Sequence, residues 1–239
     1  MGRLRKERRH NNDVTPETDK IKRPFELHQI EPITKRQIQT FDEYKKGQNL
    51  QLIGSAGTGK TFVSLYLALE QILNTRSPYK KIILVRSVVP TREMGFLPGS
   101  MKEKIKIYES PYHGICSELF HRDDAYEILK QKNLLEFTST SFVRGMTFKN
   151  AIVIVDEFSN CNYHELDSII TRIGTNSKII FSGDIKQSDL TNDYDKRGIL
   201  KFISILQKMK SFSTLEFMPE DIVRSGLVKE YLLTKESMS

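Results

Sequence analysis

Short runs of apolar residues recur along this chain, and longer stretches with a helical spacing of apolar positions separate them. The runs are strand-sized and continuous, as in Ile152-Val153-Ile154-Val155, which is typical of parallel strands buried on both faces. The predicted strands span 50–53, 81–85, 134–138, 151–155, 178–181 and 214–217. The predicted helices span 34–46, 60–74, 120–132, 162–173, 197–210 and 221–235. This alternation predicts an α/β domain with a mainly parallel sheet flanked by helices, which binds ligands at the carboxyl ends of its strands.

Two segments depart from this pattern. Residues 1–24 are polar and carry a basic cluster, so we interpret them as a disordered arm, with residues 25–239 forming the folded domain. The cluster consists of Arg3, Arg5, Lys6, Arg8 and Arg9. The arm would either contact nucleic-acid phosphates or be a solvated tail. The stretch Val89–Gly114 is rich in proline and glycine, which predicts an irregular insertion at the rim of the sheet.

The composition narrows the class of protein. A length of 239 residues fits one well-cored domain, and the net charge of +7 favours a polyanionic partner. Cys116 and Cys161 lie far apart without metal-ligand spacing, which indicates a reducing compartment, so we expect a cytoplasmic protein. No apolar run is long enough to span a membrane, and no membrane partner is expected.

A glycine-rich segment follows the first predicted strand and opens a predicted helix. It matches the pattern G-x-x-x-x-G-K-[ST] and is called the phosphate loop below. It consists of Gly54, Ser55, Ala56, Gly57, Thr58, Gly59, Lys60 and Thr61. Such a loop wraps its backbone N–H groups around the phosphates of a nucleotide, and the helix N-terminus adds its dipole. Lys60 is expected to contact the β- and γ-phosphates.

Two carboxylates follow the predicted strand 151–155. Asp156 is expected to hold Mg²⁺ through its water shell, while the Thr61 hydroxyl is a direct ligand. Glu157 is expected to orient and deprotonate the attacking water. A solvated acidic turn is the alternative, which the phosphate loop disfavours.

Two glutamines are candidates for contacts to the nucleotide. Gln187 follows the strand 178–181 and would contact the γ-phosphate or the catalytic water, unless it belongs to a simple Gly-Asp turn. Gln37 precedes the phosphate loop by one helix and would bind the adenine edge through its amide. Thr34-x-x-Gln37 is equally the pattern of a helix capping box, in which Gln37 would bond back to the backbone of Thr34.

These elements together resemble the PhoH family of ATPases. Besides the phosphate loop, the likeness rests on Gly95-Phe96-Leu97-Pro98-Gly99, Arg144-Gly145, Asp156-Glu157, Gly183-Asp184-Ile185-Lys186-Gln187 and Asp221-Ile222-Val223-Arg224. The resemblance runs from about Ile33 to Leu233, and the compact form is similar to that of phage-encoded members. It implies a single RecA-like P-loop domain that hydrolyses ATP, coupled in some members to the unwinding of RNA or DNA.

A single motor domain has no partner domain within the chain to supply an arginine finger. We therefore expect a homo-oligomeric ring in which a neighbouring copy supplies the finger, with a hexamer as the expected assembly. Arg224 matches the late arginine of the family and is the first candidate; a solvent-exposed helix arginine is the alternative. Arg144 is a second candidate or a contact to RNA or single-stranded DNA.

Further basic and aromatic positions would serve a nucleic-acid strand. Phe142 would stack on a base, although a core position is the favoured interpretation. Arg86, Arg92 and the lysines 102, 104 and 106 flank the insertion and would track phosphates, or form a solvated basic face.

The sequence thus predicts an oligomeric ATPase that uses ATP and Mg²⁺ and acts on nucleic acid as a helicase. A nucleotide-dependent binding switch with little turnover and a small-molecule kinase are the alternatives. The kinase is disfavoured because Asp156-Glu157 supplies a glutamate that activates water.

Overall fold

The computed structural model describes residues 25–88, 101–190 and 192–237. The predicted basic arm and Arg92 lie outside these residues, as do the side chains of Lys102 and Lys104.

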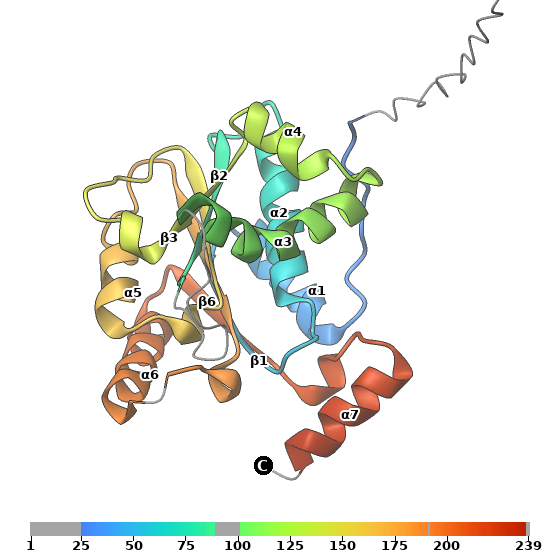
Figure 1. Ribbon diagram of the computed structural model, residues 1–239, viewed down its shortest axis with the longest axis vertical. Coiled ribbons are helices and arrows are strands. Elements are labelled where there is room, and N and C mark those ends of the chain that lie inside the picture. The colour runs from blue at the N-terminus through green and yellow to red at the C-terminus, as the bar shows by residue number, and fades with distance from the viewer. Residues whose placement is uncertain (1–24, 89–100, 191, 238–239) are drawn as a thin grey trace, which may run out of the picture.

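The described chain folds around a six-stranded sheet of order β3-β2-β4-β5-β1-β6, in which all neighbouring strands are parallel (Figure 1). The strands are β1 Asn49–Gly54, β2 Lys81–Arg86, β3 Leu135–Ser139, β4 Ala151–Asp156, β5 Lys178–Gly183 and β6 Phe212–Phe217. The described helices are α1 Lys35–Lys45, α2 Lys60–Leu73, α3 Met101–Phe120, α4 Ala125–Gln131, α5 Tyr163–Ile170, α6 Asp193–Lys208 and α7 Gly226–Ser237. All six predicted strands are confirmed.

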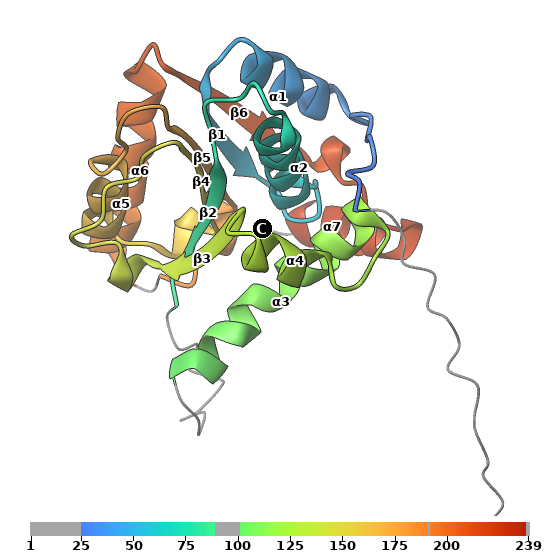
Figure 2. The same ribbon diagram turned by 90° about the horizontal axis from the view of Figure 1, so that it is seen from above.

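Helices cover both faces of the sheet, because alternate residues of its central strands are apolar on each face. Ile82 and Leu84 of β2 pack in the cluster beneath α1 to α4, whereas Ile83 and Val85 pack in the cluster beneath α5 and α6. Figure 2 shows this arrangement, with α5 and α6 on one side of the strands and α1 and α2 on the other. Continuous apolar strands therefore form the middle layer of a three-layer domain.

The strand order brings three chain segments to one edge of the sheet. Strand β5 lies between β4 and β1, with Asp156 opposite Ser182 and Ile53 opposite Gly183. The phosphate loop, the acidic pair after β4 and the Gly183–Gln187 segment consequently share the carboxyl edge.

The prediction of an irregular insertion over Val89–Gly114 is wrong for its second half, since α3 begins at Met101 and continues through Pro111 to Phe120. A proline removes one helical hydrogen bond, from its own nitrogen to the carbonyl four residues earlier. Pro111 and Ile107 are both exposed, so water can hydrate the carbonyl that loses its partner. Residues 89–100 are outside the described part.

Cys116 and Cys161 are buried and free. Burial raises the pKa of the Cys116 thiol to about 12, so it is packed as a neutral apolar group. None of the described helices combines the length and the apolar character needed to cross a bilayer.

Candidate active site

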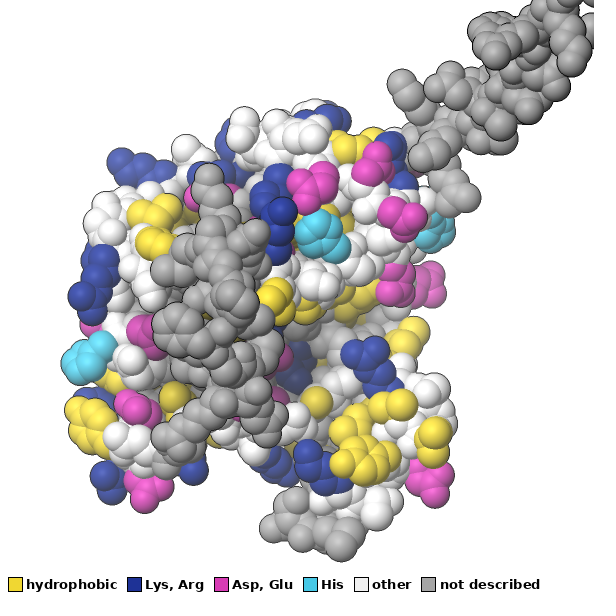
Figure 3. Space-filling model, in the orientation of Figure 1, with side chains coloured by type: hydrophobic (Ala, Val, Ile, Leu, Met, Phe, Trp, Pro, Cys, Tyr) yellow, Lys and Arg dark blue, Asp and Glu magenta, His cyan; other side chains and the backbone are white. Residues whose placement is uncertain are grey.

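A pocket of about 750 Å³ opens at the carboxyl edge of the sheet, and we call it the strand-end pocket. Residues of the phosphate loop, of α3 and of the segments after β4 and β5 line it, together with Val223 and Arg224. In Figure 3 the surface is hollowed between α7 and the body of the domain, and basic and acidic side chains lie inside the hollow. Its volume is in the range of small-molecule and cofactor sites.

The phosphate loop has a backbone that requires glycine. Gly54 has φ +122°, and a Cβ there would lie 2.0 Å from the carbonyl oxygen of Phe217. Gly57 has φ +74°, and a Cβ there would lie 2.9 Å from Cγ of Arg224. Helix α2 begins at Lys60, within the last residues of the phosphate loop, so its free N–H groups face the pocket.

Lys60 lies inside the loop and is 8% exposed. Its Nζ donates to the carbonyl oxygens of Gly54 at 2.8 Å and Ser55 at 2.7 Å. Burial lowers the pKa of this ammonium group, and the nearby carboxylates of Asp184, Glu157 and Asp156 oppose that shift. The loop therefore holds a buried cation among carbonyl oxygens and next to three carboxylates.

The hydroxyl of Thr61 joins the phosphate loop to β4. Its Oγ1 donates to Oδ1 of Asp156 at 2.8 Å, although the two residues are 95 positions apart in sequence. The second oxygen of this carboxylate, Oδ2, accepts from Tyr112 Oη at 2.8 Å. The two residues predicted to hold Mg²⁺ are therefore in direct contact, and α3 contributes a third group.

Glu157 has a backbone conformation that is unusual for a residue with a side chain, with φ 50° and ψ 42°. Strained backbone of this kind is often retained where it directs a functional side chain. Burial and the adjacent Asp156 raise the pKa of the Glu157 carboxyl group. A carboxylate with a raised pKa is a stronger proton acceptor, as a general base requires.

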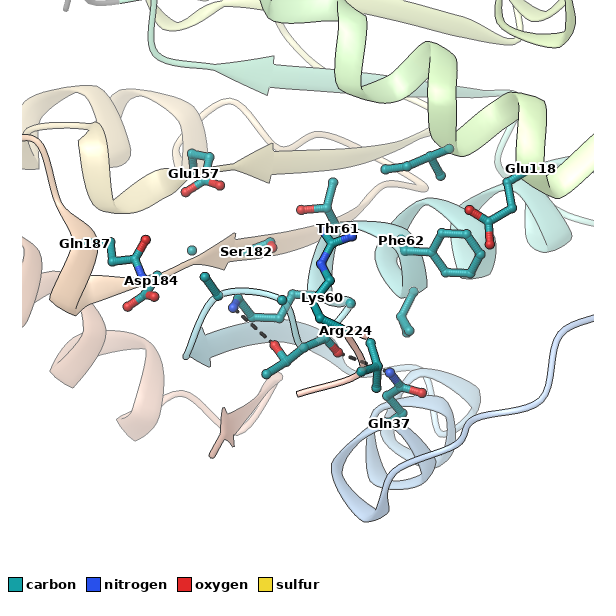
Figure 4. A pocket seen from close by; sticks show the side chains of 18 of the residues that line it. Gln37, Lys60, Thr61, Phe62, Glu118, Glu157, Ser182, Asp184, Gln187 and Arg224 are labelled. Carbon is teal, nitrogen blue, oxygen red and sulfur yellow. Dashed lines mark hydrogen bonds between the residues drawn. The ribbon is translucent and has the colours of Figure 1, made fainter. Parts of the chain in front are cut away.

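The segment after β5 places two more polar side chains in the pocket. Asp184 is 6% exposed and accepts from the backbone N–H of Lys186 at 3.0 Å. Gln187 lines the strand-end pocket from a short 3-10 turn. In Figure 4 both lie with Glu157 at one end of the pocket, Phe62, Glu118 and Gln37 lie at the other, and Lys60 and Thr61 lie between.

Gln37 forms only half of the predicted capping box, and its predicted contact to adenine stays a prediction. Its backbone N–H donates to Thr34 Oγ1 at 3.2 Å, but its Oε1 accepts from the N–H of Ile33 rather than that of Thr34. Its Nε2 donates to the carbonyl oxygen of Thr58 in the phosphate loop at 3.1 Å. One amide N–H and one lone pair stay available, because an amide has two of each. Gln37 therefore braces the loop and still faces the pocket.

Arg224 lies against the phosphate loop of its own chain. Beside its contact at Gly57, the preceding N–H of Val223 donates to the carbonyl oxygen of Gly57 at 3.0 Å. Buried Asp221 shapes this segment by accepting from the N–H of Met218 at 3.0 Å. Arg224 therefore lines the strand-end pocket of its own chain, and its delivery to a neighbouring copy stays a prediction.

Arg86, predicted as a nucleic-acid contact, lies at the acidic end of the strand-end pocket, and that contact stays a prediction. It ends β2, opposite Asp156 of β4, and lines the strand-end pocket. Its side chain lies close enough to Tyr112, Asp156 and Glu157 to interact with them electrostatically. The structure therefore places this arginine among the carboxylates of the pocket.

The segment after β3 carries an exposed aromatic ring next to an exposed cation. Phe142 is 52% exposed, so the interpretation of Phe142 as a core residue is wrong. Arg144 is exposed two positions later. Both follow the carboxyl end of β3, at the edge of the sheet where the strand-end pocket opens.

Sequence reasoning missed the contribution of α3. Ile115 and Glu118 of this helix line the pocket, and Tyr112 reaches Asp156 from the same helix. A helical spacing of apolar residues indicates this helix in the sequence. These residues are Tyr112, Cys116, Leu119 and Phe120, which are all buried. The proline and glycine content of the stretch obscured it.

The family model described as PhoH-like protein matches residues 29–235. A PhoH-like protein of Synechocystis is 34% identical over 197 residues, covering 82% of this chain and 59% of that protein. One of Bacillus subtilis is 34% identical over 181 residues, covering 75% of this chain and 56% of that protein. The chain thus spans less than two thirds of the length of these curated relatives.

Among solved structures, the large terminase of a thermophilic bacteriophage superposes with a TM-score of 0.50 at 14% identity, covering 84% of this chain and 50% of that one. This likeness concerns the fold. The predicted fold, an α/β domain of the RecA-like P-loop class with a parallel sheet flanked by helices, is confirmed. The match over residues 29–235 and the identities of its relatives show that the chain belongs to the PhoH-like protein family.

Proposed function

We propose that this protein hydrolyses ATP with Mg²⁺ and couples hydrolysis to binding of RNA or single-stranded DNA. The contact between Thr61 and Asp156 carries the proposal, because it joins a phosphate loop to the acidic end of another strand at 2.8 Å. Phosphoryl transfer requires this pair of elements at one place, with the loop for the phosphates and the oxygen ligands for the metal.

The residues present fit a magnesium ion. Thr61 and Asp156 offer hydroxyl and carboxylate oxygens, which are hard ligands, and Mg²⁺ keeps several waters when few protein groups bind it. When bound, the ion would neutralise charge on the β- and γ-phosphates. Thr61 would be its direct ligand and Asp156 would hold its water shell.

Glu157 and Gln187 are the proposed groups at the reacting end of the pocket. Glu157 would accept a proton from the attacking water, and its raised pKa supports this function. Gln187 would orient the same water or the γ-phosphate through its amide. Lys60 would exchange its two carbonyl partners for phosphate oxygens, which are stronger acceptors.

The opposite end of the pocket suits a base. Ile30, Ile33, Phe62 and Ile115 give it an apolar lining, and Gln37 supplies the amide. Bidentate contact of a glutamine amide selects adenine over guanine, because guanine presents a different order of donors and acceptors. This combination supports ATP as the nucleotide.

The coupling to nucleic acid rests on charge and on the surface after β3. An exposed ring and an exposed cation, Phe142 and Arg144, are the pair that stacks on bases and contacts phosphates of a single strand. The net charge of +7 agrees with a polyanionic partner. We further propose a homo-oligomeric ring, in which each Arg224 lies against the phosphate loop of its own subunit and a neighbouring copy supplies a further arginine finger.

A product assay tests this function. Purified protein incubated with ATP and Mg²⁺ should release free phosphate, and RNA or single-stranded DNA should raise the rate. Lys60→Ala should lose nucleotide binding, because it removes the cation of the phosphate loop. If phosphate is released but no nucleic acid raises the rate, the protein is an ATPase that is not coupled to nucleic acid. If ATP binds and no phosphate is released, the protein is a nucleotide-dependent binding switch.

A further inference from the structure

Helix α3 crosses the strand-end pocket and inserts a buried tyrosine beside the acidic end of β4. Tyr112 is 0% exposed, and its ring lies 5.9 Å from that of Phe137 in β3, so the ring has a fixed place in the core. Its hydroxyl reaches Oδ2 of Asp156 at 2.8 Å. The same helix supplies Ile115 and Glu118 to the pocket wall.

The direction of the hydrogen bond between Tyr112 and Asp156 follows from the chemistry of the groups. A guanidinium has only donors, so the Arg86 side chain beside Tyr112 can offer its oxygen only a donor. The single hydroxyl proton of Tyr112 is then directed to Asp156. Arg86, Tyr112 and Asp156 therefore lie in a row of polar groups, in which the Tyr112 hydroxyl donates to the Asp156 carboxylate.

Both oxygens of Asp156 consequently have a hydroxyl donor. Thr61 bonds to Oδ1 and Tyr112 to Oδ2, each at 2.8 Å. Two donors from different elements fix the rotation of the carboxylate about its side-chain bond. One lone pair on each oxygen stays free, which suits acceptance from metal-bound water rather than direct ligation.

We propose that Tyr112 is a positioning residue for the magnesium-holding carboxylate and that it links α3 to the hydrolytic site. The inference rests on the proposed function, because it concerns how Asp156 holds the metal. Groups that orient metal ligands commonly contribute about 10-fold to 100-fold in metal affinity or activity. Loss of the Tyr112 hydroxyl should therefore weaken the response to Mg²⁺ by about 10-fold or more.

The chain contains a matched control for this hydroxyl. Tyr126 of α4 is also 0% exposed, and its Oη also donates to a carboxylate, Oε1 of Glu109 in α3, at 3.0 Å. Glu109 and Tyr126 do not line the strand-end pocket. Tyr126→Phe removes a buried tyrosine hydroxyl from the same helix pair and leaves Asp156 and its donors in place.

The experiment compares Tyr112→Phe with Tyr126→Phe and the wild type. Binding of a fluorescent ADP analogue is measured in EDTA and across a Mg²⁺ titration, and the melting temperature of each protein is recorded. We expect Tyr112→Phe to bind in EDTA as the wild type does, with a half-saturating Mg²⁺ concentration raised about 10-fold. Tyr126→Phe should keep the wild-type Mg²⁺ dependence, even if its melting temperature falls equally.

Two outcomes overturn the inference in distinguishable ways. If wild-type binding responds to Mg²⁺ and Tyr112→Phe responds identically to Tyr126→Phe, Tyr112 is a structural residue while the proposed function stands. If wild-type binding does not respond to Mg²⁺, the proposed function and this inference fail together.

A double-mutant cycle with Asp156→Asn keeps the inference testable if Tyr112→Phe folds poorly. A residue that acts through Asp156 should cause no further change in Mg²⁺ dependence once the carboxylate is gone. Independent, multiplicative effects of the two substitutions would contradict the proposed positioning.

Discussion

At the residue scale, most of the site consists of side chains whose positions follow from where a strand or a helix ends. Thr61 is the second residue of α2, Asp156 ends β4, and Glu157 follows Asp156. Their types and spacing in the sequence predicted that they would meet, and the contact between Thr61 and Asp156 agrees with that prediction. Their catalytic functions stay predictions.

Gln37 shows what sequence reasoning could not determine at this scale. One prediction gave its side chain adenine as a partner and the other gave it the backbone of Thr34. The side chain instead contacts the backbone of both Ile33 and Thr58. The contact to Thr58 depends on the packing of α1 against a loop 21 residues away, which local patterns do not encode. Local patterns do not encode the contact between Arg86 and Tyr112 either, because it depends on how α3 packs against the sheet.

Substitution of Gln37 separates base recognition from bracing of the loop. Glu in place of Gln keeps the acceptor for Ile33 but cannot donate to Thr58 or to an adenine nitrogen. For Gln37→Glu we expect the KM for ATP to rise by about 10-fold and the KM for GTP to rise less. Steady-state hydrolysis of both nucleotides measures this.

Gln39→Glu is the control for Gln37→Glu, since it makes the same charge change on the same helix at a residue that bonds to Arg36. Equal losses for ATP and GTP, with a lower melting temperature, would show that Gln37 only braces the loop.

At the element scale, the strands were predictable and α3 was not. Continuous apolar runs of about four to six residues have few alternatives to a buried parallel strand. Helix α3, by contrast, contains Pro111 and follows a stretch rich in proline and glycine, so local preference disagreed with its apolar spacing. Packing of Tyr112, Cys116 and Phe120 in the core outweighs that preference.

Helix α7 is the element whose contact with the phosphate loop is easiest to test. A Cβ at Gly57 would lie 3.3 Å from Cδ1 of Leu232, so this leucine packs beside the loop, whereas Leu233 is 38% exposed. Leu232→Ala should reduce the free energy of unfolding by about 1–2 kcal/mol and weaken nucleotide binding several-fold. Chemical denaturation and nucleotide titration measure the two effects.

Leu233→Ala removes the same atoms from the neighbouring position of α7 and should change neither quantity appreciably. If both alanine variants bind nucleotide as the wild type does, α7 does not support the phosphate loop.

At the scale of the whole molecule, the surface after β3 should bind a single strand. Each neutralised phosphate contributes a slope of about −0.7 in log affinity against log salt concentration. Arg144→Ala should reduce this slope by about one such contribution and abolish stimulation of hydrolysis by RNA or single-stranded DNA. Phe142→Ala should weaken binding and leave the slope unchanged, because stacking involves no counterions.

Lys149→Ala serves as the charge-matched control for Arg144→Ala. Lys149 is exposed like Arg144 but precedes β4, at the amino edge of the sheet. If the slope of log affinity against log salt concentration falls equally for both alanine variants, binding depends on the overall charge of the protein. The surface after β3 is then not the binding site.

Oligomers built from two inactive variants test where Arg224 acts. Because Arg224 lies against Gly57 of its own chain, mixing Arg224→Ala with Glu157→Gln should restore no activity. Sedimentation must first show that each variant assembles as the wild type does. Recovery on mixing would show that the arginine completes the site of a neighbouring subunit.

The most direct test of the account is the turnover of Glu157→Gln under saturating ATP and Mg²⁺. The glutamine keeps the shape of the side chain and removes the proton acceptor, so nucleotide binding should persist while phosphate release falls by about 10²–10⁴-fold. Glu118→Gln makes the same change at the other end of the strand-end pocket and should retain turnover. Phosphate release by Glu157→Gln near the wild-type rate would contradict the proposed hydrolytic site.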